Sequence, residues 1–132
     1  MKKDTQEHGT GEFIVKVEQL DKAAVIRFAG ELDANSAVAA DDTLSEVVNS
    51  DFDHLLIDCT ELRYISSAGV GVFLSSFHAC AEKKVDIIFY GLQPKIKNVF
   101  AILGLGKIFK EAATQEEALK LTTSSSTPSQ QS

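Results

Sequence analysis

The sequence predicts a single α/β domain, a mixed sheet of four to five strands that opens with a β-hairpin and is covered by about four helices. Length and composition support one globular core, because 132 residues, 44% of them hydrophobic, suffice for one domain and are short for two. Segments with a hydrophobic period of two also alternate with segments of helical period. The resulting order, β-β-α-β-α-β-α-(β)-α, is typical of a sheet with helices packed on it.

The first two strands are predicted from alternating apolar and polar residues. This pattern runs over residues 13–18 and returns over residues 24–28, with the turn-like Leu20-Asp21-Lys22 between the two runs. Two such runs joined by a short turn predict an antiparallel hairpin. A second turn-like segment, Gly30-Glu31-Leu32-Asp33, follows the hairpin.

The middle of the chain alternates between helix and strand. Helical spacing of apolar residues, with acidic residues on the opposite face, predicts a helix from about Ser36 to Asn49. The segment His54 to Asp58 contains an unbroken apolar run that is too short for a helix and suits a central strand covered on both faces. Apolar residues at i, i+3, i+4 and i+7 predict a helix over Ala68 to Ala81, and β-branched and aromatic residues predict a strand over Val85 to Tyr90.

The C-terminal third is predicted to hold two further helices. Pro94 suits the first position of a helix that extends to about Leu103, because proline has no amide proton to lose there. A short edge strand is predicted over residues 107–109. The spacing in Thr114-Gln115-Glu116-Glu117 fits a capping box, so a last helix is expected to run from there to Leu121.

Both ends of the chain are predicted to lie outside the fold. Residues 1–11 are mostly polar and are expected to form a flexible N-terminus. Residues 122–132 contain only Thr, Ser, Pro and Gln, without apolar anchors or charge, which is typical of a disordered tail. The folded domain is therefore expected over residues 12–121.

Charge and composition argue against several classes of partner. Nineteen acidic and thirteen basic residues give a net charge of −6, so the chain as a whole offers no basic footprint for nucleic acid or an anionic membrane. No apolar stretch approaches the roughly 20 residues of a spanning helix, and polar residues follow the N-terminal Met1-Lys2-Lys3 where a secretory signal would be apolar. We expect a cytoplasmic protein that binds neither nucleic acid nor a membrane directly.

The sequence indicates no metal site, cofactor or catalytic residues. Cys59 and Cys80 lack metal-binding spacing and are expected to be core thiols, and the three histidines are scattered. His78 lies eleven positions after Ser67, and eleven helical residues rise about 16 Å, too far for a nucleophile and its base. A Gly-x-Ser-x-Gly elbow and a phosphate-binding P-loop are both absent. We therefore expect that the protein is not an enzyme.

The most informative segment is Tyr64-Ile65-Ser66-Ser67-Ala68-Gly69-Val70-Gly71, where two serines precede an amphipathic helix. A serine there can act as N-cap, which contributes about 1 kcal/mol. A helix N-terminus also favours negative charge, so a phosphoryl group on Ser67 would be accommodated without deforming the fold. Gly69 and Gly71 each cost about 1 kcal/mol in a helix relative to Ala, which suggests a contact surface that requires them.

Gly30-Glu31-Leu32-Asp33, followed about 35 residues later by Ser66-Ser67-Ala68-Gly69-Val70-Gly71, resembles the STAS domain of bacterial anti-sigma factor antagonists. The resemblance spans nearly all of residues 13 to 121. It implies that the unmodified protein binds an anti-sigma factor serine kinase, which has a histidine-kinase-like ATPase fold, and so frees a sigma factor. Phosphorylation of one serine at the start of the second helix would release the kinase, and a metal-dependent PPM-type serine phosphatase would reset the switch.

The resemblance assigns the phosphorylated serine to Ser67, with Ser66 as second choice. The family motif often reads Asp-Ser-Ser/Thr-Gly, whereas here Ser66 takes the Asp position and Ala68 the third; Ser-Ser-Ala-Gly resembles another common version. Asp33 is implied to meet a basic residue of the kinase, although an aspartate there can equally form an Asx-turn or a helix cap. The implied partner-binding residues are Glu31, Asp33, Ser66, Ser67, Gly69 and Val70.

Two other functions stay open at the level of sequence. In the first, the chain is a structural STAS subunit of a signalling or lipid-transport assembly, and Ser66 and Ser67 only cap a helix. Its mass would then stay unchanged after coexpression with a cognate kinase. In the second, the chain is a small hydrolase, which requires turnover that depends on Ser67.

Overall fold

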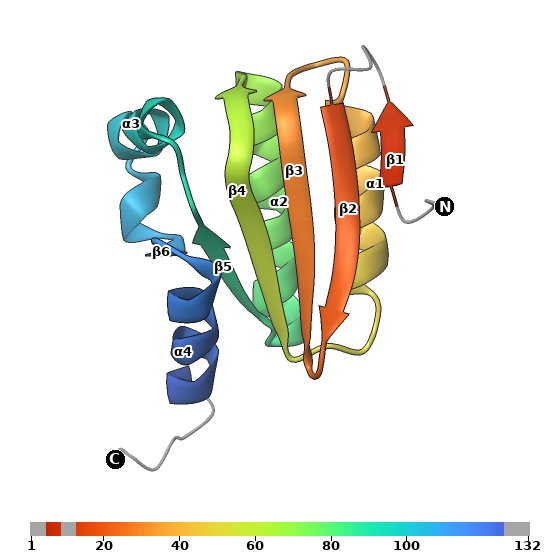
Figure 1. The fold of residues 1–132 in the computed structure, drawn as a ribbon, viewed down its shortest axis with the longest axis vertical. Coiled ribbons are helices and arrows are strands. Elements are labelled where there is room, and N and C mark those ends of the chain that lie inside the picture. The colour runs from red at the N-terminus through yellow and green to blue at the C-terminus, as the bar shows by residue number, and fades with distance from the viewer. Residues whose placement is uncertain (1–4, 9–12, 126–132) are drawn as a thin grey trace.

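The computed structural model describes residues 5–8 and 13–125 of the chain. Within them one mixed sheet contains six strands in sequence order (Figure 1). The strands are β1 (Thr5–His8), β2 (Phe13–Leu20), β3 (Ala23–Leu32), β4 (His54–Ile65), β5 (Asp86–Tyr90) and β6 (Lys110–Ala112). The pairs β1–β2 and β2–β3 are antiparallel, and the pairs from β3 to β6 are parallel. The predicted mixed α/β sheet with its hairpin is confirmed, and the sheet has one strand more than the four to five expected.

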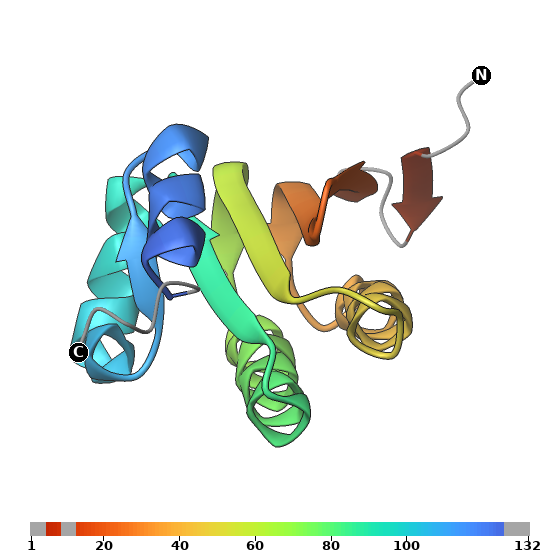
Figure 2. The same cartoon turned by 90° about the horizontal axis from the view of Figure 1, so that it is seen from below.

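Helices cover the two faces of the sheet unequally (Figure 2). They are α1 (Ala37–Val48), α2 (Ser67–Lys83), α3 (Pro94–Ile102) and α4 (Gln115–Ser125), with a short 3-10 helix, η1 (Leu105–Lys107), after α3. Helices α1 and α2 lie on one face, called here the inner face, whereas α4 lies on the other, the outer face. In the described part of the chain, Figure 2 shows no helix over the outer side of β2.

The main core lies between the inner face and helices α1, α2 and α3. A row of phenylalanine rings crosses it from β2 to β5. Phe73 of α2 is central to this row, because its ring centroid lies 5.8 Å from Phe28 on β3 and 5.0 Å from Phe89 on β5. A smaller cluster between the outer face and α4 contains Leu56, Ile88 and Ala118. Strand β4 is therefore covered on both faces where α4 reaches it, as its apolar run predicts.

Strand β4 continues to Ile65, well beyond the predicted end at Asp58. Beyond Asp58 its buried residues are Cys59, Leu62 and Ile65, with a spacing of three where a strand normally has two. The register of β4 against β3 shifts twice in this part, and each shift adds one residue to β4. These bulges break the period that a sequence pattern relies on, which explains why this half of the strand was not predicted.

Three predictions near the chain ends and edge require correction. Strand β1 lies inside the segment predicted to be flexible, where it pairs with β2. The C-terminal tail was predicted to start at residue 122, but α4 continues to Ser125; Thr122 is 7% exposed and its hydroxyl donates to the Leu119 carbonyl at 2.6 Å. Residues 1–4, 9–12 and 126–132 lie outside the described residues, so the remaining parts of both predictions stay untested.

The sheet has the short edge strand predicted between α3 and α4, but the predicted bounds, residues 107–109, are wrong. Residue 107 ends the 3-10 helix η1, and the edge strand β6 begins three residues later, at Lys110. Phe109 does not lie on an edge, because its ring stacks on Phe89 with centroids 4.5 Å apart and is 3% exposed. Aromatic packing thus places this segment in the core.

Candidate functional site

The carboxyl ends of β3 and β4 meet at the edge of the sheet where α2 begins (Figure 1). Leu32 and Ile65 are register partners, and the Ser66 amide donates to the Leu32 carbonyl at 2.9 Å. The loop after β3 and the first turn of α2 therefore lie side by side. This juxtaposition brings together the two segments on which the predicted site depends.

The two adjacent serines have different roles. Ser66 is the N-cap of α2; its backbone is extended, and its hydroxyl oxygen accepts from the Gly69 amide at 3.4 Å. Ser67 is the first residue of the helix and is exposed, and its hydroxyl has no partner among the described residues. Ser66 therefore has the N-cap role that either serine could have had, and the Ser67 hydroxyl is not used as a cap.

Gly69 and Val70 were predicted to contact a partner, and the structure places both below the surface. A Cβ atom on Gly69 would lie 2.7 Å from the Leu32 carbonyl oxygen and 2.8 Å from Ile65 Cγ1. Gly69 is therefore required where α2 approaches β3, and Val70, 7% exposed, belongs to the core. Gly71 is exposed, with nothing within 4 Å of an added Cβ. Close packing thus explains the glycine at position 69, whereas it does not explain the glycine at position 71.

Asp33 organises the loop beside Ser67. Its Oδ1 accepts from the Asn35 amide at 2.9 Å and from the Ser36 amide at 3.2 Å, which is an Asx-turn leading into α1. The Ser36 hydroxyl, in a residue only 1% exposed, donates to the Glu31 carbonyl at 2.8 Å and accepts from the Asp33 amide at 3.0 Å. From the sequence, Ser36 is predicted only as the start of a helix, because its two partners in the loop are set by the fold. The Glu31 side chain is exposed and has no partner among the described residues.

The N-terminus of α2 by itself favours an anion at Ser67. Helix α2 has 17 residues, all described, and its first turn carries no acidic side chain. The positive end of the helix dipole and the amides of the first turn are therefore not neutralised by a carboxylate from the helix itself. A phosphoryl group attached to Ser67 would occupy a favourable place without displacing the N-cap.

The remaining chemical groups offer little reactivity. Both cysteines are buried and free. Burial raises the pKa of the Cys59 thiol far above its usual range and that of Cys80 to about 11, so neither is a thiolate near neutral pH. Among the described residues no group of three or more His, Cys, Asp or Glu side chains could hold a metal ion. The same part of the chain contains no helix long and apolar enough to span a membrane.

Comparison with known proteins defines the family. The family model of the STAS domain matches residues 15–118. The chain is 32% identical over 82 residues to an anti-sigma-B factor antagonist of Listeria monocytogenes. This aligned region covers 62% of this chain and 72% of that protein. It is 26% identical over 102 residues to the putative anti-sigma factor antagonist BtrV of Bordetella bronchiseptica, covering 77% and 88% of the two chains. The chain belongs to the STAS domain family of anti-sigma factor antagonists, as its motifs predicted.

Solved structures show the same fold. An anti-sigma factor antagonist from Mycobacterium paratuberculosis superposes with a TM-score of 0.77 at 22% identity, over 83% of this chain and 92% of that one. The unphosphorylated form of the anti-sigma factor antagonist SpoIIAA superposes with a TM-score of 0.72 at 24% identity, over 83% and 96%. These likenesses confirm the predicted STAS fold.

Proposed function

We propose that this protein acts in the cytoplasm as an anti-sigma factor antagonist in a partner-switching module, controlled by reversible phosphorylation of Ser67. In its unphosphorylated form it binds an anti-sigma factor serine kinase with a histidine-kinase-like ATPase fold, so that the sigma factor is freed. Phosphorylation of Ser67 releases the kinase, and a PPM-type serine phosphatase restores the binding form. The protein itself is a regulatory ligand and not an enzyme.

The observation that carries this proposal is the division of roles between the two serines. Ser66 occupies the N-cap, so modification of Ser67 leaves the start of α2 intact. Ser67 is exposed at the first helical position, which makes its hydroxyl accessible to a kinase. The names of the Listeria and Bordetella relatives support the same class of function.

The proposed switch changes the interface and not the fold. A phosphoserine carries about −1.5 to −2 charges at pH 7, which a helix N-terminus accommodates, so the melting temperature should change little. A kinase that can modify Ser67 must place its nucleotide phosphates and acidic groups close to that serine. One like-charge pair 4 Å apart costs about 4 kcal/mol at an effective dielectric constant near 20.

Repulsion alone falls short of a complete switch. Moving an equilibrium from almost fully bound to almost fully free requires about 5.5 kcal/mol. Desolvation of the phosphate in the contact supplies the remainder. Aspartate, with one charge and a smaller shape, should therefore imitate the modification only in part.

Calorimetric titration against the cognate kinase tests the proposal. We expect Ser67→Ala to bind and to resist release by ATP, and Ser67→Asp to bind weakly, with both variants folded. Ser75→Asp adds the same charge at an exposed position further along α2 and should bind like wild type. Ser66→Ala should lose about 1 kcal/mol of stability as an N-cap variant but still gain a phosphate, measured by intact mass.

Equal kinase affinity for wild type, Ser67→Ala and Ser67→Asp would contradict the switch. That result, with an unchanged mass after coexpression with the kinase, would favour a structural STAS subunit. Turnover of an ester substrate that is lost in Ser67→Ala would instead indicate a hydrolase.

A further inference from the structure

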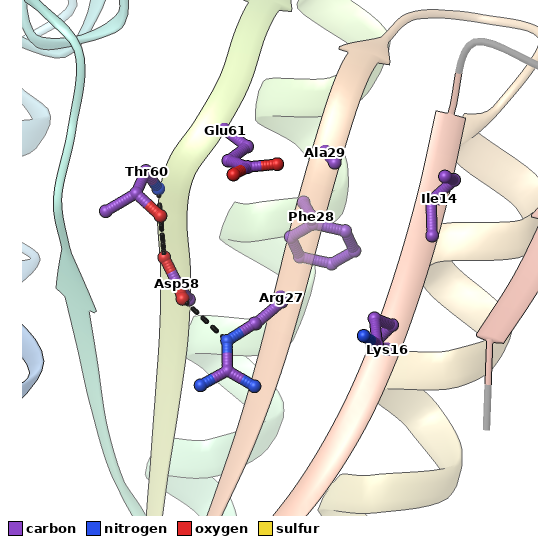
Figure 3. Close-up of a pocket in the computed structure, with 8 residues that line it drawn as sticks. All are labelled: Ile14, Lys16, Arg27, Phe28, Ala29, Asp58, Thr60 and Glu61. Atoms are coloured by element: carbon purple, nitrogen blue, oxygen red, sulfur yellow. Dashed lines mark hydrogen bonds and ion pairs between the residues drawn. The ribbon is translucent and has the colours of Figure 1, made fainter.

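A hollow of about 210 Å³ opens on the outer face of the sheet, and Ser66 and Ser67 are not among the residues that line it (Figure 3). It lies over Phe28 and Ala29 of β3 and is bounded by Ile14 and Lys16 on β2 and by β4 on the other side. A hollow of this volume is large enough for a small metabolite. The hollow plays no part in the proposed phosphorylation switch.

Three features of the fold create this space. The apolar cluster under α4 involves Ala23, Val25 and Leu56, so α4 packs against the earlier residues of β3 and β4 and leaves their later residues uncovered. Ala29 has a small side chain, and the register of β4 shifts between Asp58 and Glu61. A bulge of this kind redirects side chains, and here both Thr60 and Glu61 line the hollow.

Hydrogen bonds satisfy the polar groups of Asp58 and Thr60 on the β4 wall of the hollow. Asp58, whose side chain is 9% exposed, accepts from the Thr60 amide at 2.9 Å, the Thr60 hydroxyl at 2.7 Å and Arg27 Nε at 2.9 Å. Thr60 is held from the β5 side, because Gln93 Nε2 donates to its carbonyl at 2.8 Å. A second ion pair, from Arg27 Nη1 to Glu18, fixes the guanidinium.

Charge in the hollow is arranged in two rows across the strands. Lys16, Arg27 and Asp58 form one row of register partners. Ile14, Ala29 and Glu61 form the next row on the same face. Two strand residues separate the rows, a distance of about 7 Å.

Three groups in these rows remain available for a ligand. Lys16 Nζ, Arg27 Nη2 and the Glu61 carboxylate have no partner among the described residues, and the lysine and glutamate side chains belong to exposed residues. Donors for a carboxylate thus lie in one row, and an acceptor for an ammonium group lies in the other. Ile14 and Ala29, which lie in the same row as Glu61, give the hollow an apolar floor beside that carboxylate.

We propose that this hollow binds a small aliphatic zwitterion of the ω-amino acid class. Its carboxylate contacts Lys16 and Arg27 Nη2, its ammonium group contacts Glu61, and its methylene groups pack on Ala29. A ligand with only one charge satisfies one row and leaves the other unpaired. The chemistry of the two rows therefore selects for both charges on one short chain.

Ligand-observed NMR and calorimetry on the full chain test this site with three probes of five carbons each: 5-aminopentanoate, pentanoate and pentylamine. We expect 5-aminopentanoate to bind with a dissociation constant of about 1 mM or below, and each single-charge probe at least about tenfold more weakly. Lys16→Met and Glu61→Gln should each weaken 5-aminopentanoate binding about tenfold. Lys120→Met, an exposed lysine on α4, is the matched control and should bind like wild type.

Ala29→Leu fills the hollow from the strand surface and should abolish binding, with thermal unfolding as the check that the variant folds. If that variant fails to fold, the two exposed variants still decide the question. The proposal is overturned if 5-aminopentanoate does not bind, if all three probes bind alike, or if Lys16→Met and Glu61→Gln bind as wild type does. These outcomes are independent of kinase binding and of Ser67.

Discussion

Replacing Gly69 by alanine tests whether close packing positions the start of α2. The added Cβ would lie 2.7 Å from the Leu32 carbonyl oxygen and 2.8 Å from both Leu32 Cγ and Ile65 Cγ1. The carbonyl belongs to the backbone of β3 and already accepts from the Ser66 amide at 2.9 Å, so it cannot move aside freely. Overpacking of this kind costs about 1 to 3 kcal/mol, and we expect the upper end because a backbone atom is involved.

Helix propensity opposes this cost. Alanine is favoured over glycine inside a helix by about 1 kcal/mol, so the net loss for Gly69→Ala should be about 2 kcal/mol. For a domain of this size, that corresponds to a fall in melting temperature of about 8 °C.

Gly71→Ala is the matched control, two positions along the same helix. Nothing lies within 4 Å of its added Cβ, so only the propensity gain applies, and the melting temperature should rise by about 4 °C. Urea and thermal unfolding of both variants measure these differences. If Gly69→Ala were as stable as wild type or more so, the close approach of α2 to β3 would not be the reason for this glycine.

Three further predictions concern the core, the C-terminus and pH. Leu56→Ala removes a fully buried side chain from the central strand and should cost about 2 to 5 kcal/mol in urea unfolding, whereas a loss below about 1 kcal/mol would make this strand peripheral. A chain that ends after Leu121 should melt at a lower temperature in calorimetry than one that ends after Ser125, because Thr122 is buried in α4; equal melting temperatures would restore the tail boundary first predicted. Burial raises the pKa of Tyr90 from 10.0 to about 12, so the folded state holds its proton more tightly than the unfolded state does. Stability should therefore fall as pH rises between those two values, and Tyr90→Phe should abolish that part of the fall.

Much of the fold was predictable because its signals are local. Alternation over residues 13–18 and 24–28 predicted β2 and β3, and apolar residues at helical spacing predicted α1 and α2 within a few residues. These periods follow from the geometry of one strand or one helix, which neighbouring residues determine. The two serines before α2 and the turn at Gly30 to Asp33 also carried the family resemblance without any knowledge of packing.

Only the tertiary structure decided which contacts those elements make and which role each residue has. Ser66, the N-cap of α2, also donates its amide to the carbonyl of Leu32 on β3, a contact between segments far apart in the chain. The later half of β4 depends on bulges in its register with β3, which erase the period of two. The packing role of Gly69 and the hollow over Ala29 likewise depend on what a distant segment covers or leaves open. Sequence periodicity shows on which face of a helix or strand a residue lies. Contacts between elements far apart in the chain decide which segment, if any, packs against that face.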